Sequence, residues 1–180
     1  LQQKGIKQQT GKEKLSLESK KKFFVCTSSS EYSRGIIRKL RRQAVVISQL
    51  PSEMLKPGND NGEVLSRWID NTAGALNMHD MVVASIEKPA VYDRSLAAFL
   101  CDCTVSLIEN VLSKTKVDEL IIEGGATASA AVRRLGFNNF FPCSELARGV
   151  VRMKIEHRNL YLTVKPGSYH WPGKLLNGKM

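Results

Sequence analysis

The stretch Ile-Ile-Glu-Gly-Gly-Ala-Thr, residues 121–127, places two adjacent glycines where an apolar run ends and a helical pattern begins. Gly124 and Gly125 carry no Cβ, so the backbone there can approach a ligand closely. Thr127 can cap the helix and offers a hydroxyl, and the backbone N–H groups of a helix start attract anions. Together these groups predict a phosphate-binding nest. Close packing of the helix on a sheet explains the glycines equally well, and this stretch alone leaves both explanations open.

A second group of polar side chains, in the sequence TSSSEYS (27–33), follows another apolar run. Hydroxyls at a helix start supply an N-cap and several donors, and the first turn of that helix attracts an anion. Taken alone, ordinary serine capping is the simpler explanation of this loop.

Both loops need a scaffold, and the apolar pattern of the chain predicts one. Four short runs of β-branched and aromatic residues are nearly continuous rather than alternating, which is typical of parallel strands buried on both faces. Helical patterns with apolar positions every three to four residues separate these runs. The expected strands lie at 22–27, 44–48, 81–86 and 119–125, the expected helices at 33–43, 62–77, 93–114 and 127–136, and a turn-rich loop at 51–63.

The pattern changes after Gly136. The runs VVRMKIE (150–156) and LYLTVKP (160–166) are separated by a short polar turn, which predicts an antiparallel hairpin. We therefore expect an α/β fold: a three-layer sandwich with a mostly parallel sheet and a C-terminal antiparallel hairpin. Ligands of such sheets bind beyond the carboxyl ends of the strands, where both polar loops fall.

The net charge of +10 over 180 residues raises the question of nucleic-acid binding. Residues 1–22 hold seven lysines against two glutamates and so carry half of the excess. We interpret 1–22 as a solvated basic linker or lead-in, 23–176 as one domain and 177–180 as a tail. A nucleic-acid binder that uses Lys20–Lys22 and the basic helix residues at 38–42 is a weaker alternative, because no aromatic residues interleave with these cations. We expect no nucleic-acid partner.

The four cysteines and three histidines lack the spacing of metal ligands. We expect free thiols and no metal centre. Because free thiols are typical of a reducing compartment, we expect the protein to lie in the cytoplasm. No apolar run approaches the roughly 20 residues that span a bilayer, so we expect no membrane partner. The segment GSYHWPGK (167–174) resembles a phosphate loop, but it has five residues between its glycines and Leu175 where the hydroxyl should be.

In order along the chain, four segments resemble the nucleotide-binding C-terminal domain of the four-carbon acid sugar kinases. That family shows a Gly-Ser-x-Ser loop, a Gly-Gly-Glu-Thr loop, a Glu-x-x-x-Gly-Val turn and a Lys-x-Gly-x-Phe-Gly end. The resemblance covers about residues 23 to 176. It implies the ATP-binding domain of a kinase that phosphorylates a hydroxyl of a four-carbon sugar acid with ATP and Mg²⁺, and a separate N-terminal domain of the same protein that binds the sugar acid. The segments are TSSSEYS (27–33), EGGATASAAVRRLGF (123–137), ELARGVV (145–151) and LYLTVKPGSYHWPGKLL (160–176).

The resemblance also assigns nucleotide-contacting positions, whereas it leaves the catalytic base unknown. Thr27, Ala126 and Tyr169-His170 depart from the family motifs, and Ala126 replaces an acidic residue. The alternative is therefore a catalytically degenerate kinase-like domain that acts as a binding or assembly module. Homo-oligomerisation is left open. The implied nucleotide-binding residues are Ser28, Gly124, Gly125, Ala126, Thr127 and Gly167.

Overall fold

The computed structural model describes residues 21–28, 30–55, 61–86, 94–167 and 169–172. Most of the predicted lead-in (1–22) and all of the predicted tail (177–180) lie outside these residues, and both stay predictions.

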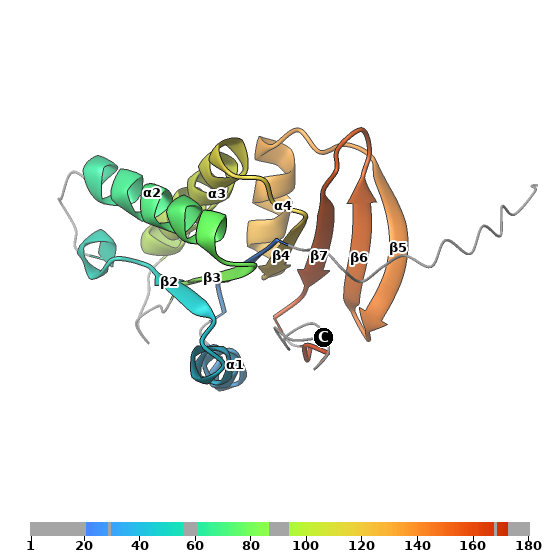
Figure 1. The fold of residues 1–180 in the computed structure, drawn as a ribbon, viewed down its shortest axis with the longest axis horizontal. Helices are drawn as coiled ribbons and strands as arrows, with labels where there is room; N and C mark the ends of the chain where they lie inside the picture. The colour runs from blue at the N-terminus through green and yellow to red at the C-terminus, as the bar shows by residue number, and fades with distance from the viewer. Residues whose placement is uncertain (1–20, 29, 56–60, 87–93, 168, 173–180) are drawn as a thin grey trace, which may run out of the picture.

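One seven-stranded sheet, in the order β2-β3-β1-β4-β7-β6-β5, forms the centre of the domain (Figure 1). The pairs from β2 to β7 are parallel, whereas β6 pairs antiparallel with both β7 and β5. This confirms the expected mixed sheet with its C-terminal hairpin. The strands are β1 (Lys22–Cys26), β2 (Val46–Gln49), β3 (Met81–Ser85), β4 (Glu119–Glu123), β5 (Phe140–Ala147), β6 (Val150–Ile155) and β7 (Tyr161–Lys165).

Helices cover the two faces of the sheet unequally. Figure 1 shows α1 on one face and α2, α3 and α4 together on the other. Alternation along the strands explains both cores: Phe23 and Val25 join the core under α2 to α4, and Phe24 and Cys26 join the core under α1. The helices are α1 (Glu31–Arg42), α2 (Gly62–Met78), α3 (Arg94–Lys114) and α4 (Gly125–Arg134), with a short 3₁₀ helix η1 (Ser52–Leu55) before α2.

The connections place a topological switch point between β1 and β4. The chain leaves β1 for α1 on one face and leaves β4 for α4 on the other face, although β1 and β4 are neighbours in the sheet. A crevice forms at such a point beyond the carboxyl ends of the two strands, and open α/β sheets bind their ligands there.

Three local expectations were wrong. Helix α4 begins at Gly125 rather than at 127, and the loop at 51–63 contains η1. The hairpin has a third strand, β5, which the sequence did not indicate because none of its residues is fully buried and it contains Pro142. Proline lacks an N–H, and strands that contain it lie at sheet edges, as β5 does.

Among the described residues, α3 is the one helix long and apolar enough to cross a membrane, with a mean hydropathy of 1.5. The expectation that no run has this character therefore overlooked α3. In the fold α3 contacts both α2 and α4, and its apolar face is part of the core. Its buried residues are Leu100, Cys103, Thr104, Val105, Leu107, Ile108 and Val111.

Candidate functional site

The two polar loops predicted separately from the sequence touch each other at the switch point. Cys26 and Glu123, the last residues of β1 and β4, are paired in the parallel register. Just beyond them, the Oγ1 of Thr27 donates a hydrogen bond of 2.8 Å to the Glu123 carbonyl. The hydroxyl of Thr127 in turn donates to the Thr27 hydroxyl at 3.4 Å. The loop after β1 and the start of α4 are thus one connected structure.

The two glycines of the Gly-Gly turn have different reasons to be there. Gly124 has a φ of +120°, and a Cβ on it would lie 2.5 Å from the Oγ1 of Thr27. That φ and that contact both require glycine. A Cβ on Gly125 would meet no described atom within 4 Å. Close packing therefore explains Gly124 and leaves Gly125 unexplained.

Helix α4 presents an open N-terminus at this place. Its N-cap is Gly124, which makes no side-chain capping bond, and its first turn has no acidic residue. Gly125 and Ala126 are exposed. The expected capping role of Thr127 is wrong, because Thr127 lies within the first turn and bonds to Thr27 instead. The first N–H groups of α4 thus lack a side-chain cap, and such groups attract anions in general.

The loop after β1 is itself capped, as the simpler reading of its serines predicted. Ser30 is the N-cap of α1, and its Oγ accepts a hydrogen bond of 3.1 Å from the Ser33 backbone N–H. Ser28 is half-buried beside it, and its Oγ accepts from the Ser30 N–H at 3.3 Å. Ser28 thus follows Thr27, the residue that contacts Thr127 in α4, and its hydroxyl is bonded to Ser30.

The remaining two motif segments reach the same edge of the sheet. Gly149, in the turn between β5 and β6, has a φ of +73°, and its N–H donates to the Glu145 carboxylate at 2.9 Å. A Cβ on Gly149 would lie 3.0 Å from the ring of Tyr169. Tyr169 and Gly167 follow β7, so the turn and the end of β7 pack together. A cavity of about 320 Å³ opens there, lined by Ala147, Arg148, Tyr169 and His170.

Beneath these loops lies a buried carboxylate that the sequence did not single out. The Glu123 side chain is fully buried and its Oε1 lies 2.8 Å from the Lys165 Nζ. Ser33 donates to the same oxygen at 2.7 Å. The Cys26 thiol and the Trp171 indole N–H donate to Oε2 at 3.2 and 3.3 Å. Because Lys165 lies 42 positions away in the sequence, only the strand register could reveal this pair.

Cys26 is not a reactive thiol. Burial, together with the neighbouring Glu123 carboxylate, raises its pKa far above the ordinary value of 9.0. The thiolate is the nucleophilic form of cysteine, and Cys26 therefore acts here only as a hydrogen-bond donor. All four cysteines are free, and Cys26 and Cys103 are buried, whereas Cys101 and Cys143 are half-buried.

The described residues offer no ligand set for a metal ion. No group of three or more His, Cys, Asp or Glu side chains comes together among them. The carboxylates on these segments already have partners: Glu123 pairs with Lys165, Glu145 accepts the Gly149 N–H, and Glu31 pairs with Arg34 and Arg38. The described side chains therefore offer no set of three acidic, histidine or cysteine ligands to a Mg²⁺ ion.

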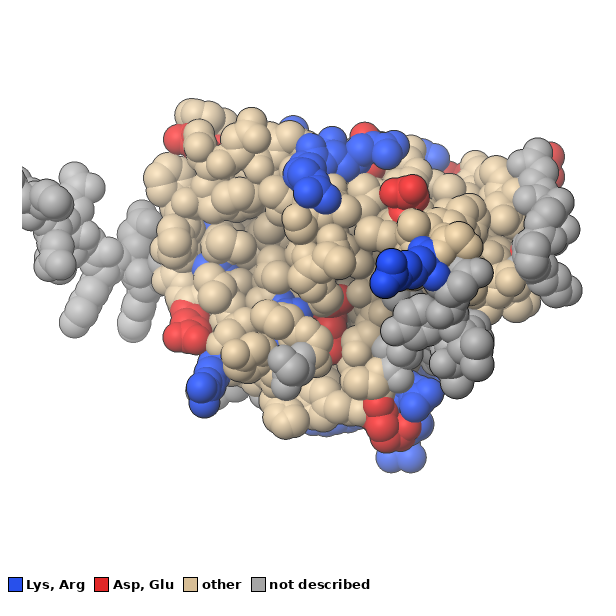
Figure 2. Space-filling view, turned by 180° about the vertical axis from the view of Figure 1, so that it is seen from behind, with Lys and Arg blue, Asp and Glu red and all other residues tan. Residues whose placement is uncertain are grey.

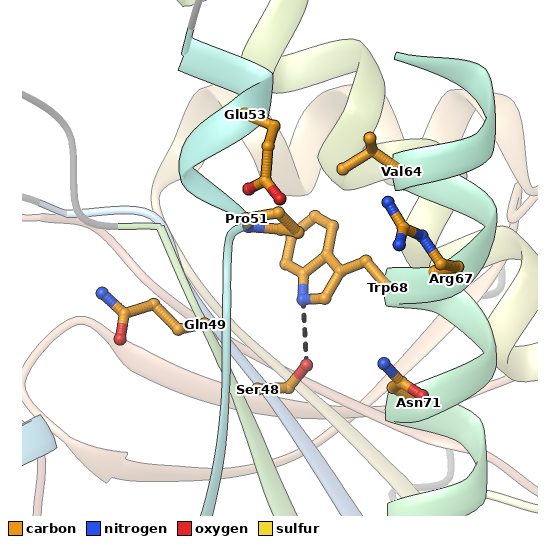
Figure 3. A pocket seen from close by; sticks show the side chains of 8 residues that line it. All are labelled: Ser48, Gln49, Pro51, Glu53, Val64, Arg67, Trp68 and Asn71. Carbon is orange, nitrogen blue, oxygen red and sulfur yellow. Dashed lines mark hydrogen bonds between the residues drawn. The ribbon is translucent and has the colours of Figure 1, made fainter.

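A second cavity, the Trp68 pocket, lies away from the glycine loops, at the carboxyl end of the edge strand β2 (Figure 3). It measures about 310 Å³. The indole N–H donates to the Ser48 hydroxyl at 2.9 Å, and Ser48 also bonds to Thr72. The Trp68 indole, the Ser48 hydroxyl and the Thr72 hydroxyl thus bond to one another. None of the predicted site residues lines this pocket. Its lining residues are Ser48, Gln49, Pro51, Glu53, Val64, Arg67, Trp68 and Asn71.

The basic residues of the chain do not gather into a nucleic-acid surface on the face that Figure 2 shows. Blue and red side chains lie in several separate places on that face, often next to each other, and most of the face is neutral. On α1, Arg34 and Arg38 both pair with Glu31, at 3.1 and 2.6 Å. The hydrogen bond and charge of Arg38 lower the pKa of Glu31. This arrangement fits the solvated helix face expected from the sequence.

The fold and the paired loops define a ligand-binding α/β domain of the open-sheet class, with its site at a switch point. Within that class, the chain belongs to the family described as the nucleotide-binding C-terminal domain, which matches residues 23–169. Over 113 residues the chain is 26% identical to the 3-oxo-tetronate kinase of Actinobacillus succinogenes. The resemblance to the four-carbon acid sugar kinases is confirmed.

Two solved structures share the fold. One is a Haemophilus influenzae protein of the DUF1537 family, with a TM-score of 0.62 and 22% identity over 88% of this chain and 40% of that one. The other is a Bordetella bronchiseptica domain of unknown function, a domain-swapped dimer with bound citrate, with a TM-score of 0.60 and 19% identity over 84% of this chain and 38% of that one. The match to the Actinobacillus kinase covers 59% of this chain and 27% of that protein. The chain thus spans less than half the length of these relatives.

Proposed function

We propose that the chain binds the phosphate groups of an adenine nucleotide between the loop after β1 and the start of α4. The observation that carries the proposal is the contact of these loops at the switch point, where α4 offers uncapped N–H groups. Gly125 supports it further, because its missing Cβ leaves space that no described atom fills. A phosphate there would accept hydrogen bonds from backbone donors and gain from the dipole of α4.

The cavity beside Tyr169 suits the rest of the nucleotide. Its lining combines the aromatic rings of Tyr169 and His170 with the cationic Arg148. An aromatic ring offers a stacking surface for a base, and a guanidinium offers donors to a ribose or a phosphate. Because Gly167 and Tyr169 follow β7, the neighbour of β4, a nucleotide could extend from the start of α4 into this cavity.

In the whole protein, this domain would serve an ATP-dependent kinase that phosphorylates a hydroxyl of a four-carbon sugar acid. Mg²⁺ would neutralise charge on the triphosphate, held by the phosphate oxygens rather than by the side chains described. The residues of this chain would orient the phosphates, because phosphoryl transfer needs positioning and charge neutralisation more than covalent help. We propose that the acceptor sugar acid and the base that activates it belong to the N-terminal domain.

Replacing Gly125 with valine tests the site directly. The added side chain enters the space left for a phosphate, so calorimetric titration of ATP should show no saturable binding. The thermal midpoint should stay within a few degrees, because no described atom is displaced. Gly74→Val on α2 is the matched control, since its Cβ also meets nothing within 4 Å, and it should bind ATP normally. Unchanged ATP binding by Gly125→Val would contradict the proposed site.

A catalytically degenerate binding module is the second candidate function. Ala126 stands where the family motif has an acidic residue, and the nearest carboxylate, Glu123, is buried against Lys165. Such a module would bind nucleotide without turnover even when its N-terminal domain is present. An assay of the complete protein with ATP, Mg²⁺ and four-carbon sugar acids separates the two candidates, because only the kinase releases ADP.

A further inference from the structure

Glu123 connects four structural elements that surround the proposed nucleotide site. Its carboxylate accepts a hydrogen bond from Ser33 in α1 and another from Cys26 at the end of β1. It pairs with Lys165 at the end of β7 and accepts the indole N–H of Trp171. Glu123 itself is the residue directly before Gly124, the N-cap of α4.

Lys165 extends this network to the segment after β7. Its Nζ donates to the carbonyl oxygens of Pro166, Gly167 and Tyr169, at 3.1, 3.3 and 2.6 Å. We name residues 166–167 and 169–171 the C-terminal strap. The lysine therefore fixes the strap that carries Gly167 and one wall of the cavity beside Tyr169.

The strap is also anchored at its far end. The Trp171 ring packs edge-on against Phe24, with ring centroids 5.1 Å apart. The backbone N–H of Trp171 donates to the Tyr32 hydroxyl at 3.0 Å. Trp171 is 5% exposed. The anchors at Trp171 thus lead to α1, to β1 and to the carboxylate of Glu123.

We propose that Glu123 is a positioning residue that holds the loop after β1, the start of α4 and the C-terminal strap in one arrangement competent to bind nucleotide. This inference rests on the proposed nucleotide site. The carboxylate does not touch the ligand, and it acts through Lys165, Ser33 and Trp171. Preorganising loops before binding removes the cost of ordering them, which is how a residue outside the site increases affinity.

Strand β4 supplies a matched control at its opposite end. Glu119 is 1% exposed, and its Oε1 lies 3.2 Å from the Nε of the buried Arg152 and accepts the Thr163 hydroxyl. Both glutamates therefore sit on one face of one strand, each in a buried ion pair, and about 13 Å apart at the strand rise of about 3.3 Å per residue. Glu119→Gln and Glu123→Gln should destabilise the fold by comparable amounts, but only the second disturbs the strap.

The fluorescence of Trp171 distinguishes a displaced strap from a general loss of stability. A lower stability alone does not change the emission of the molecules that remain folded. The chain has two tryptophans, so Trp68→Phe leaves Trp171 as the one emitter. In this background, Glu123→Gln should shift the Trp171 emission to longer wavelength without any nucleotide, because the indole loses its anchored, buried environment. Glu119→Gln should leave the emission of the folded protein unchanged. Equal spectra for the two variants would overturn the inference.

Nucleotide titrations complete the test. Glu123→Gln should weaken ADP binding by about tenfold, the factor that 1.4 kcal/mol represents, whereas Glu119→Gln should bind like the parent. The double variant Glu123→Gln/Lys165→Met removes both charges, avoids a buried unpaired lysine, and should be just as weak because the strap carbonyls lose their donor. Normal binding by Glu123→Gln beside a parent that binds would overturn the positioning role and leave the proposed function standing. A parent that fails to bind ADP would instead overturn the proposed function, and the positioning role with it.

Discussion

Gly124 allows the loop after β1 and the start of α4 to lie in contact. Its φ of +120° turns the chain from β4 into α4, and the Thr27 hydroxyl occupies the space where a Cβ would be. Threonine at 27 departs from the glycine of the family motif. The structure shows its physical consequence, which is a side chain that links the two loops through the Glu123 carbonyl and the Thr127 hydroxyl.

We expect Gly124→Ala to lower the free energy of unfolding by about 1–3 kcal/mol, the cost of forcing a side chain into a strained backbone region. Gly125→Ala should be close to neutral, because its Cβ meets open space. In a Thr27→Ala background the cost of Gly124→Ala should fall, since the clash with Oγ1 is gone and only the φ remains. Urea denaturation of the four variants measures this. An equal cost in both backgrounds would show that the Thr27 contact is unimportant.

At the scale of elements, the uncapped N-terminus of α4 can be tested by adding a charged side chain to its first turn. Its first turn contains no acidic residue and no side-chain cap. Ala126→Glu adds a carboxylate to that turn and should stabilise the fold by about 0.3–1 kcal/mol through the helix dipole. The same charge should repel metal-free ATP and be less unfavourable to Mg·ATP, so the affinity ratio should move towards Mg·ATP. An equal change for both ligands, measured by calorimetry, would show that a carboxylate at 126 has no metal role.

The sequence predicted those elements whose apolar pattern lies within one short stretch of the chain. Buried parallel strands such as β3 appear as continuous apolar runs, and apolar spacing of three to four residues predicted α1, in which Ile36, Ile37 and Leu40 are buried. The start of α4 was misplaced by two residues because glycine is a weak N-cap signal beside Thr127. Strand β5 was missed because an edge strand with exposed side chains has little apolar pattern.

The candidate site was predictable only in part, for a physical reason. The sequence indicated Ser28, Gly124, Gly125 and Gly167 by type and motif order, and the strand order brings their loops to one edge. Glu123 carried no sequence signal, because a glutamate at the end of a strand usually faces water. Its role depends on Lys165, Ser33 and Trp171, which come from three distant segments. Long-range pairing of this kind needs the register of the sheet.

At the scale of the whole molecule, we propose that the chain offers one wall of a binding cleft. It spans less than half the length of its relatives, and it supplies no ligand set for Mg²⁺ among the described residues. In the proposed half-site, one side of the nucleotide would stay in water, which screens its charge contacts. We expect the chain alone to bind ATP with a Kd of about 0.1 to 1 mM, equivalent to about 4 to 5.5 kcal/mol.

Turnover by the chain alone should be undetectable, because we propose that a separate domain positions the acceptor hydroxyl. The measurement is ADP formation from ATP and Mg²⁺ in the presence of a panel of four-carbon sugar acids. A reaction without sugar acid controls for background hydrolysis. ADP release that depends on a sugar acid would mean that these 180 residues hold a complete active site.

The most direct test of the nucleotide site is an NMR titration of the ¹⁵N-labelled chain with ATP. The account predicts saturable shifts in the amide signals of residues 124–127, of Ser28 and of Gly167. Amides around the Trp68 pocket and around Glu119 should keep their positions, since both lie away from the switch point. Saturable shifts confined to the Trp68 pocket, with residues 124–127 unchanged, would contradict the central claim and place the ligand at the edge strand β2 instead.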